Sequence, residues 1–259
     1  METFILQMNS LIPGVVENMN AFLVIFARMM GFVRFAPVLN RKEIPALVKI
    51  GLAFLLAIIF LMLLKPKGMP DHGDLLLSII LNLAVGAMIG YMAQLILAAI
   101  DAGGDMINMQ MGLSSAMVLD PTTSSQVSLL GKFFGILGIV IFMKIGGMYW
   151  LFQAFEKSFY IFPVYSTSIP LAKLVNMDYL ISMSSNVLYM GLQIASPVLL
   201  ATLGQDIILG VISKTAPQVN VFQLSFLFKP VFGAAILIWI MPMLINVITD
   251  YFMSFSHII

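Results

Sequence analysis

Residues 75–100 have the sequence LLLSIILNLAVGAMIGYMAQLILAAI, an apolar run of 26 residues that contains no charged side chain. A helix needs about 20 apolar residues to cross the hydrocarbon core of a bilayer. At 1.5 Å per residue this run would be about 39 Å long, which exceeds the thickness of the core. The run therefore predicts a membrane helix that tilts or projects beyond the core.

The rest of the chain has the same character. Of its 259 residues, 61% are hydrophobic and only 10% are charged, and the mean hydropathy is +1.03. Soluble domains carry about 25% charged residues, so this composition indicates an integral membrane protein. We predict an all-α fold of about six long hydrophobic helices or helical hairpins, because five further stretches are long and apolar enough to span: Val15–Val33, Ile44–Leu64, Val127–Leu151, Tyr179–Leu203 and Val231–Phe255.

Charge and cysteine content exclude several classes of protein. The net charge is +1 and the chain has no cysteine, so we expect no nucleic-acid partner, no disulfide and no thiolate metal site. The first twenty residues lack a basic side chain and do not predict a cleavable signal peptide. By the positive-inside rule, the N-terminus is expected outside the cell and the Arg41–Lys42 turn inside.

The segment that follows the opening run is unusual for a connection between membrane helices. Residues 101–126 read DAGGDMINMQMGLSSAMVLDPTTSSQ, with three aspartates, three glycines, four methionines and no lysine or arginine. Irregular backbone at membrane depth must be shielded by protein or line an aqueous cavity. We therefore expect a path, a gate or a partner-covered surface here. The other long connections predicted are 152–178 and 204–230.

The methionines of this segment allow two interpretations. Methionine is flexible and polarizable, so a group of them can form a deformable seal around a pore. The alternative is that they simply fill space, as methionines do elsewhere in a chain that has 21 of them. The accompanying polar residues favour the seal. The residues concerned are Met106, Met109, Met111 and Met117, with Asn108, Gln110, Ser114 and Ser115 between or beside them.

Glycines and one arginine stand out within the apolar stretches. The pairs Gly86/Gly90 and Gly131/Gly135 have the GxxxG spacing that lets membrane helices pack closely or oligomerise, although chance spacing is an equal alternative. Arg28 lies inside the first apolar stretch. A charge at that depth is costly, so we expect an acidic partner for it elsewhere in this chain or in another.

Prolines mark two predicted turns. Pro37 and Pro45 bracket the basic turn after the first stretch, and Pro217 interrupts the polar sequence before the last one. The residue before a proline is biased away from helical geometry. All three prolines are therefore interpreted as structural parts of hairpin turns.

Enzymatic interpretations find little support. Gly103-Gly104-Asp105 is similar to the GxGD motif of intramembrane aspartyl proteases, but Ala102 occupies the first glycine position and no second aspartate has a matching context. His72 and His257 have no ligand spacing around them, and no phosphate-binding loop or Ser–His pairing is visible. We therefore expect no catalysis, no cofactor and no metal.

Three blocks of sequence resemble a known family, the FliR component of the flagellar export gate, which also includes injectisome relatives (the FliR/SctT family). They occur in family order, and the QMG…DP and APQ motifs inside the second and third are its most specific features. Asp101 departs from the family pattern, and its role stays unassigned. The blocks are RFAPVLNRKEIPALVKIGLA (34–53), AAIDAGGDMINMQMGLSSAMVLDP (98–121) and SPVLLATLGQDIILGVISKTAPQVNVFQLSF (196–226).

The resemblance implies a non-enzymatic core subunit of the bacterial flagellar type III protein export gate. It would lie in the inner membrane at the flagellar basal body, surrounded by lipid and by FliP and FliQ homologues. FlhB and FlhA would be further partners, and unfolded flagellar proteins would be the exported substrates. Residues 1–190 would form a FliP-like part and residues 191–259 a FliQ-like helical hairpin, with the boundary near Gly191.

The resemblance also assigns the central loop, within 101–126, to plugging the pore. Gly103, Gly104 and Gly112 would let the backbone turn and pack closely. The matching plug residues are Met106, Met109, Gln110, Met111, Gly112, Met117, Asp120 and Pro121.

Two other uses of the same sequence stay open. A stand-alone secondary transporter would use 101–126 as a broken-helix substrate site, although no internal repeat is visible. An injectisome export gate is the alternative within the family, since the sequence does not separate the two systems with certainty. Stoichiometry, the gating trigger and the topology within an assembled gate are also not specified by the sequence.

Overall fold

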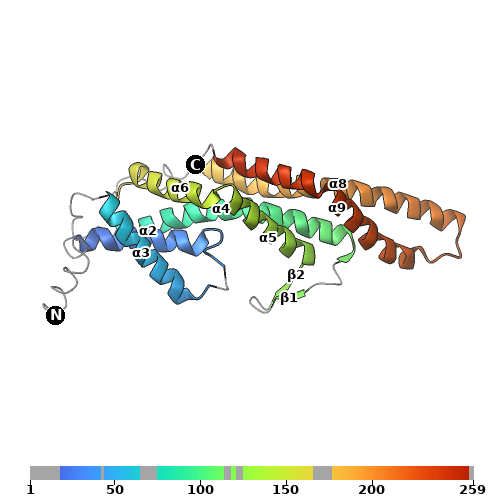
Figure 1. The fold of residues 1–259 in the computed structure, drawn as a ribbon, viewed down its shortest axis with the longest axis horizontal. Coiled ribbons are helices and arrows are strands. Elements are labelled where there is room, and N and C mark those ends of the chain that lie inside the picture. The colour runs from blue at the N-terminus through green and yellow to red at the C-terminus, as the bar shows by residue number, and fades with distance from the viewer. Residues whose placement is uncertain are drawn as a thin grey trace. The chain divides into compact units, whose positions relative to one another are not determined.

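A computed structural model describes residues 18–41, 44–64, 75–113, 118–120, 125–165 and 177–256 (Figure 1). Apart from one short antiparallel ribbon, the regular structure of these residues is helical, which confirms the predicted all-helical class. The ribbon consists of β1 (Val118–Asp120) and β2 (Ser125–Val127). The helices are α2 (Met19–Phe35), α3 (Ala46–Leu64), α4 (Leu75–Gln110), α5 (Leu129–Lys144), α6 (Gly147–Ile161), α8 (Met177–Thr215) and α9 (Val221–Ser256).

In the part of the chain that the structure describes, the number of potential membrane spans is lower than the six predicted. Among the described residues, α3, α4, α8 and α9 are long and apolar enough to cross a membrane, and the pair α5 and α6 would make a fifth if it forms one broken span. The described helix of the first stretch, α2, has 17 residues and would be about 26 Å long. That length is less than the thickness of a hydrocarbon core, about 30 Å, and the first three residues of the stretch, 15–17, lie outside the described residues.

The fourth apolar stretch is interrupted where a single helix was predicted. The axes of α5 and α6 differ by 70°. Between them Gly146 has a φ of +78°, a left-handed conformation that glycine adopts without steric cost. The C-cap of α5 ends that helix just before this glycine, where the Ile145 N–H donates to the Ile141 carbonyl. The predicted span Val127–Leu151 is therefore wrong as one continuous helix.

Four helices, α4, α6, α8 and α9, extend into segments predicted as connections. α4 continues beyond Ile100 to Gln110, so the first part of 101–126 is regular helix. α8 ends at Thr215 and α9 begins at Val221, which reduces the predicted connection 204–230 to 216–220. α6 likewise extends to Ile161, inside the predicted connection 152–178. Hydropathy alone misplaced these ends because polar side chains lower it, whereas the helical backbone satisfies its own hydrogen bonds.

The chain forms two compact units, the first of which comprises Met1–Gln94 and Tyr149–Leu180. Its described elements are α2, α3, most of α6 and the N-terminal part of α4. Phe155 lies at the centre of its aromatic core, with ring centroids 5.0 Å from Phe32 and Phe60 and 5.3 Å from Phe159. α2 packs against α3, and Pro37 and Pro45 lie on either side of the turn that joins them.

The second unit comprises Leu95–Met148 and Ile181–Ile259. It contains the C-terminal part of α4, α5, and the antiparallel hairpin of α8 and α9 (Figure 1). α5 packs on α9, where the rings of Phe142 and Phe252 lie 5.4 Å apart. Pro217 lies in the hairpin turn, and Asn220 begins α9 by accepting a 3.3 Å hydrogen bond from the Gln223 N–H. Gly191, the predicted domain boundary, lies inside α8, and the division of the chain there stays a prediction.

Candidate functional site

The predicted central segment begins inside α4, where Gly103 and Gly104 are packing positions. A Cβ on Gly104 would lie 2.7 Å from the Leu130 carbonyl oxygen of α5, and one on Gly103 would lie 3.0 Å from Ile194 of α8. The prediction that these two glycines turn the backbone is wrong, because both lie in regular helix. The turn comes later, at Gly112, where φ is +72°.

Side chains of α4 and the residue before α5 cap the N-terminus of α5. The Ser128 hydroxyl oxygen accepts a 2.9 Å hydrogen bond from the Gly131 N–H, and the same hydroxyl donates to the Asp105 carboxylate. At the residue before Gly131, the Leu130 N–H donates to Asn108 Oδ1 at 3.4 Å. The first N–H groups of a helix have no partner within it, and a negative charge beside them is stabilising. We call Asp105, Asn108, Ser128 and the first turn of α5 the α5 cap.

The glycine pair on α5 makes room for carboxylates of α4. A Cβ on Gly131 would overlap Asp105 Oδ1, and one on Gly135 would overlap Asp101 Oδ1. Asp101 and Asp105 are one helical turn apart and therefore lie on the same face of α4. The GxxxG pair of α5 thus accommodates two acidic side chains as well as a close helix contact.

The plug methionines do not share one environment. Met111 is only 2% exposed and occupies the notch at Gly233 of α9, where an added Cβ would lie 2.6 Å from Met111 Cγ. Met109, by contrast, is 68% exposed. Met106 and Gln110 are half-buried in α4. Asp120 lies in β1, whereas Met117 and Pro121 lie outside the described residues.

Arg28 is fully buried in the first unit and is held by neutral groups. Its Nε and Nη2 both donate to Asn82 Oδ1 of α4, with the Nε contact at 2.8 Å. Nη1 donates to Ser158 of α6 at 3.0 Å, and Nη2 also donates to the Phe162 carbonyl at 2.7 Å. The guanidinium carbon lies 3.9 Å from the centre of the Phe159 ring, a cation–π contact. We call this group the Arg28 cluster.

The acidic partner expected for Arg28 is absent from these contacts, which are the ones the structure describes for its guanidinium. Hydrogen bonds to an amide, a hydroxyl and a backbone carbonyl engage four of the five guanidinium N–H groups without a second buried charge. Asn82 is held in turn, since its Nδ2 donates to the Ser78 and Val164 carbonyls. The sequence signal for Asn82 was its position as one of two amide side chains, with Gln94, within the apolar run 75–100.

Close backbone contact between α2 and α4 brings the Arg28 cluster together. A Cβ on Gly86 would overlap the Arg28 carbonyl oxygen, and one on Gly31 would overlap the Leu83 carbonyl oxygen. A Cβ on Gly90 would lie 2.7 Å from the Ala36 nitrogen. The Gly86/Gly90 pair therefore lies at a helix contact of the kind that this spacing permits.

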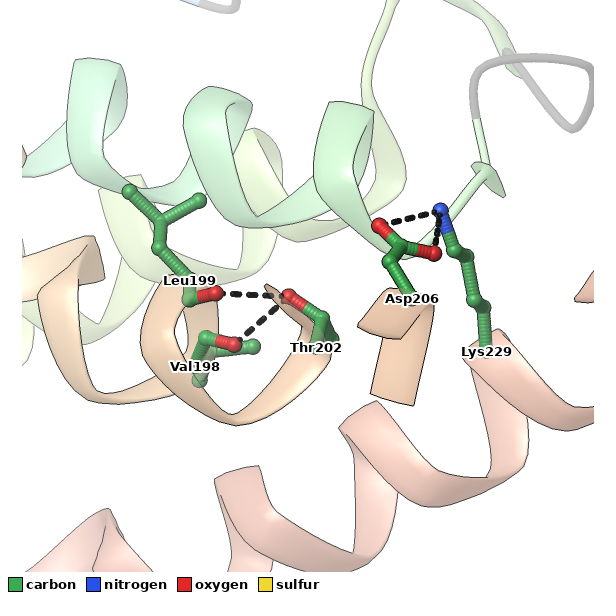
Figure 2. Close-up of polar contacts among 5 residues, drawn as sticks. All are labelled: Val198, Leu199, Thr202, Asp206 and Lys229. Atoms are coloured by element: carbon green, nitrogen blue, oxygen red, sulfur yellow. Dashed lines mark hydrogen bonds and ion pairs between the residues drawn. The ribbon is translucent and has the colours of Figure 1, made fainter. Parts of the chain in front are cut away.

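An ion pair joins the two helices of the C-terminal hairpin, as Figure 2 shows. Lys229 Nζ of α9 lies 2.7 Å from Asp206 Oδ1 and 3.0 Å from Oδ2 on α8. Close by on α8, Thr202 donates to the Val198 and Leu199 carbonyls. The pair was not predicted, although its two residues are nearly equidistant from Pro217 along the chain, and an antiparallel hairpin brings such positions level.

Among the residues that the structure describes, no three His, Cys, Asp or Glu side chains come close enough to hold a metal ion. Helices of membrane-spanning length, glycine-mediated contacts and capped helix ends define a helical multi-pass membrane protein, the class to which this fold belongs.

Sequence comparison then specifies the family. Residues 19–255 match the profile of "Bacterial export proteins, family 1", and the chain belongs to that family. The flagellar biosynthetic protein FliR of Bacillus subtilis (strain 168) is 29% identical over 92% of this chain and 93% of its own length. FliR of Escherichia coli (strain K12) is 25% identical over 84% of this chain and 82% of its own length. The surface presentation of antigens protein SpaR of Shigella flexneri is 27% identical over 82% of this chain and 83% of its own length. The resemblance to FliR predicted from three sequence blocks is confirmed.

Proposed function

We propose that this chain is a non-enzymatic core subunit of the flagellar type III export gate and forms, with FliP and FliQ homologues, the channel for unfolded flagellar proteins. Membership of the export family and similarity to FliR and SpaR support the broader statement, a subunit of a type III export gate. The partners, the channel and the basal-body location are the finer parts of the proposal.

The observation that carries the proposal is the length of the exposed apolar surface on α8 and α9. Exposed apolar side chains run along α8 from Ile181 to Val211 and along α9 from Phe222 to Met253. Each run extends about 45 Å at 1.5 Å per residue. Tilted by 40°, near the upper end of the usual range, such a run would still extend about 35 Å along the membrane normal, beyond a core about 30 Å thick.

Other protein subunits are the natural cover for the remainder of that surface. Phe222 is 82% exposed at the start of α9, beside the hairpin turn, and Phe226 is 60% exposed one turn further on. Large contiguous apolar surface on a single chain marks a site of protein or membrane interaction. A stand-alone transporter would need no such cover outside the bilayer, so this surface favours the assembled gate.

Purification of the intact complex tests the assembly. An affinity tag on this chain should co-purify FliP and FliQ homologues in fixed ratio, and deletion of the chain should abolish motility and secretion of hook and filament proteins. Substrate transport by the purified chain alone in vesicles, with no co-purifying subunit, would contradict the proposal and favour a transporter. Loss of virulence-effector secretion on deletion, with normal motility, would instead assign the chain to an injectisome.

We further propose that residues 106–121 contribute to a plug of the channel. Exposed Met109 and the half-buried Met106 and Gln110 support a deformable surface, while buried Met111 serves as its anchor against α9. Shortening of 112–127 should raise the entry of small solutes into cells while the complex still assembles. Unchanged membrane tightness in an assembled complex would disprove the plug.

A further inference from the structure

The α5 cap lies at the point where the chain leaves α4 and returns to α5. Asp105 and Asn108 belong to the last two turns of α4, and Ser128 directly precedes α5. Their hydrogen bonds therefore join the two ends of the connection that contains the plug. Ile107 and Met111 are buried beside this junction, so the ends of the connection are also held by apolar packing.

From these contacts we propose that the α5 cap is a fixed base, closed both at rest and during export, and that Asp105 is its positioning residue. The connection then begins at Met111 and ends at Ser128, at points whose positions do not change during export. This inference rests on the proposed plug function, because it assigns the point from which the plug projects.

The geometry favours a fixed base over an opening one. The α4–α5 contact at Gly104 leaves no room for a side chain, since an added Cβ would lie 2.7 Å from a backbone oxygen and 2.9 Å from the Gly131 Cα. Separating the helices would expose the N–H groups of Leu130 and Gly131, which are hydrogen-bonded only through Asn108 and Ser128 in the contacts described. Opening would therefore break both of these hydrogen bonds, each of which contributes to the stability of the closed form.

A covalent link between the two sides tests the proposal directly. The chain has no native cysteine, so the variant Asp105→Cys/Ser128→Cys can be joined specifically by a short bis-methanethiosulfonate reagent in cells whose only copy of this subunit carries the change. Without the linker, the double-cysteine variant has lost the hydrogen bond between Asp105 and Ser128. We expect the leakage of small solutes into cells that carry it to rise about fivefold or more. The linker should return leakage to within twofold of wild type and leave flagellar export within twofold.

Single-cysteine variants control for the reagent itself, and recovery on reduction shows that an effect comes from the link. A tenfold or greater loss of export on linking, reversed by a reducing agent, would overturn the fixed base. Leakage from the unlinked double-cysteine variant that stays at the wild-type level would overturn the positioning role.

Single substitutions separate positioning from folding. Asp105→Asn keeps an oxygen that can accept from Ser128 and should leak no more than twofold above wild type, whereas Asp105→Ala should leak about as much as the unlinked double-cysteine variant. Asp250→Ala is the matched control, because Asp250 is an exposed carboxylate on α9 of the same unit. Equal leakage from the Asn and Ala variants, with the complex co-purifying intact, would contradict a role for the acceptor.

The plug proposal and the fixed-base proposal are disproved by different results. If shortening of 112–127 leaves the membrane tight, the plug proposal fails. The export rate of the linked pair still reports whether the base must open.

Discussion

Each unit contains a polar group set among apolar helices, and the two groups are built differently. The Arg28 cluster is closed: its guanidinium is fully buried, and neutral oxygens from α4, α6 and the residue after α6 surround it. The α5 cap is open on one side, because Asp105 is exposed while Asn108 beside it is buried. One group holds helices together, and the other holds the end of a helix next to a long connection.

The difference shows how a polar residue is tolerated at membrane depth. A buried cation needs acceptors on several sides, which requires partners from several helices and makes the cluster a feature of the whole unit. A capping carboxylate needs only the adjacent helix end, so it does not require partners from several helices. We therefore expect substitutions in the Arg28 cluster to affect assembly and those in the α5 cap to affect membrane tightness.

The largest effect is expected from Arg28→Met. The substitution leaves the oxygens of Asn82, Ser158 and Phe162 buried without their donor, at about 1–3 kcal/mol each, so the unit should lose about 3 kcal/mol or more. Thermal unfolding of the detergent-solubilised complex and the amount of assembled gate measure it. Arg34→Met, an exposed position on the same helix, is the control and should change stability little. Equal stability of the two variants would contradict the structural role of the cluster.

A somewhat smaller loss is expected from Gly86→Ala, which tests the contact that brings Arg28 to α4. The added methyl would overlap a backbone carbonyl, and overpacking of this kind costs about 1–3 kcal/mol. Gly51→Ala in α3 has no atom within 4 Å of the added carbon and should be neutral or stabilising, because alanine favours helix. If both variants melt at the same temperature, the close contact of α2 and α4 is wrong.

Gly131→Ala should act on the α5 cap with a modest effect on stability, about 1–2 kcal/mol, and a clear effect on leakage. The methyl would displace Asp105 and Ser128 from the helix end. Solute entry into cells and complex stability are measured together, with Gly204→Ala as the control, since nothing lies within 4 Å of a Cβ there. A loss of assembly without any leakage would make the cap resemble the Arg28 cluster and remove the contrast between the units.

The smallest effect is expected for the Asp206–Lys229 pair. Its side chains are 37% and 22% exposed, and such partly solvated pairs contribute up to about 1 kcal/mol. A double-mutant cycle with Asp206→Asn and Lys229→Met on the solubilised complex should give a coupling within that range. A coupling of 3 kcal/mol or more would mean that other subunits bury the pair in the assembly.

Several features were predictable because they depend on local sequence. Long apolar runs require helices in a bilayer whatever they pack against, so α3, α8 and α9 were recognisable. Ser128 could also have been predicted as a helix cap, since it directly precedes an apolar run. The helical end of α4 was not predictable in the same way, because Asp105, Asn108 and Gln110 lower its hydropathy and only the contacts with α5 and α8 compensate.

The sequence by itself determined the membrane class, the helical fold and the export family, because hydropathy and family motifs are properties of neighbouring residues. Only the tertiary structure decided which groups satisfy Arg28, since Asn82 and Ser158 lie 54 and 130 positions away along the chain. It also decided that Gly131 and Gly135 accommodate the carboxylates of Asp105 and Asp101. The physical reason is that a buried polar group takes its stability from whichever partners folding brings within hydrogen-bonding distance, and no local pattern encodes that choice.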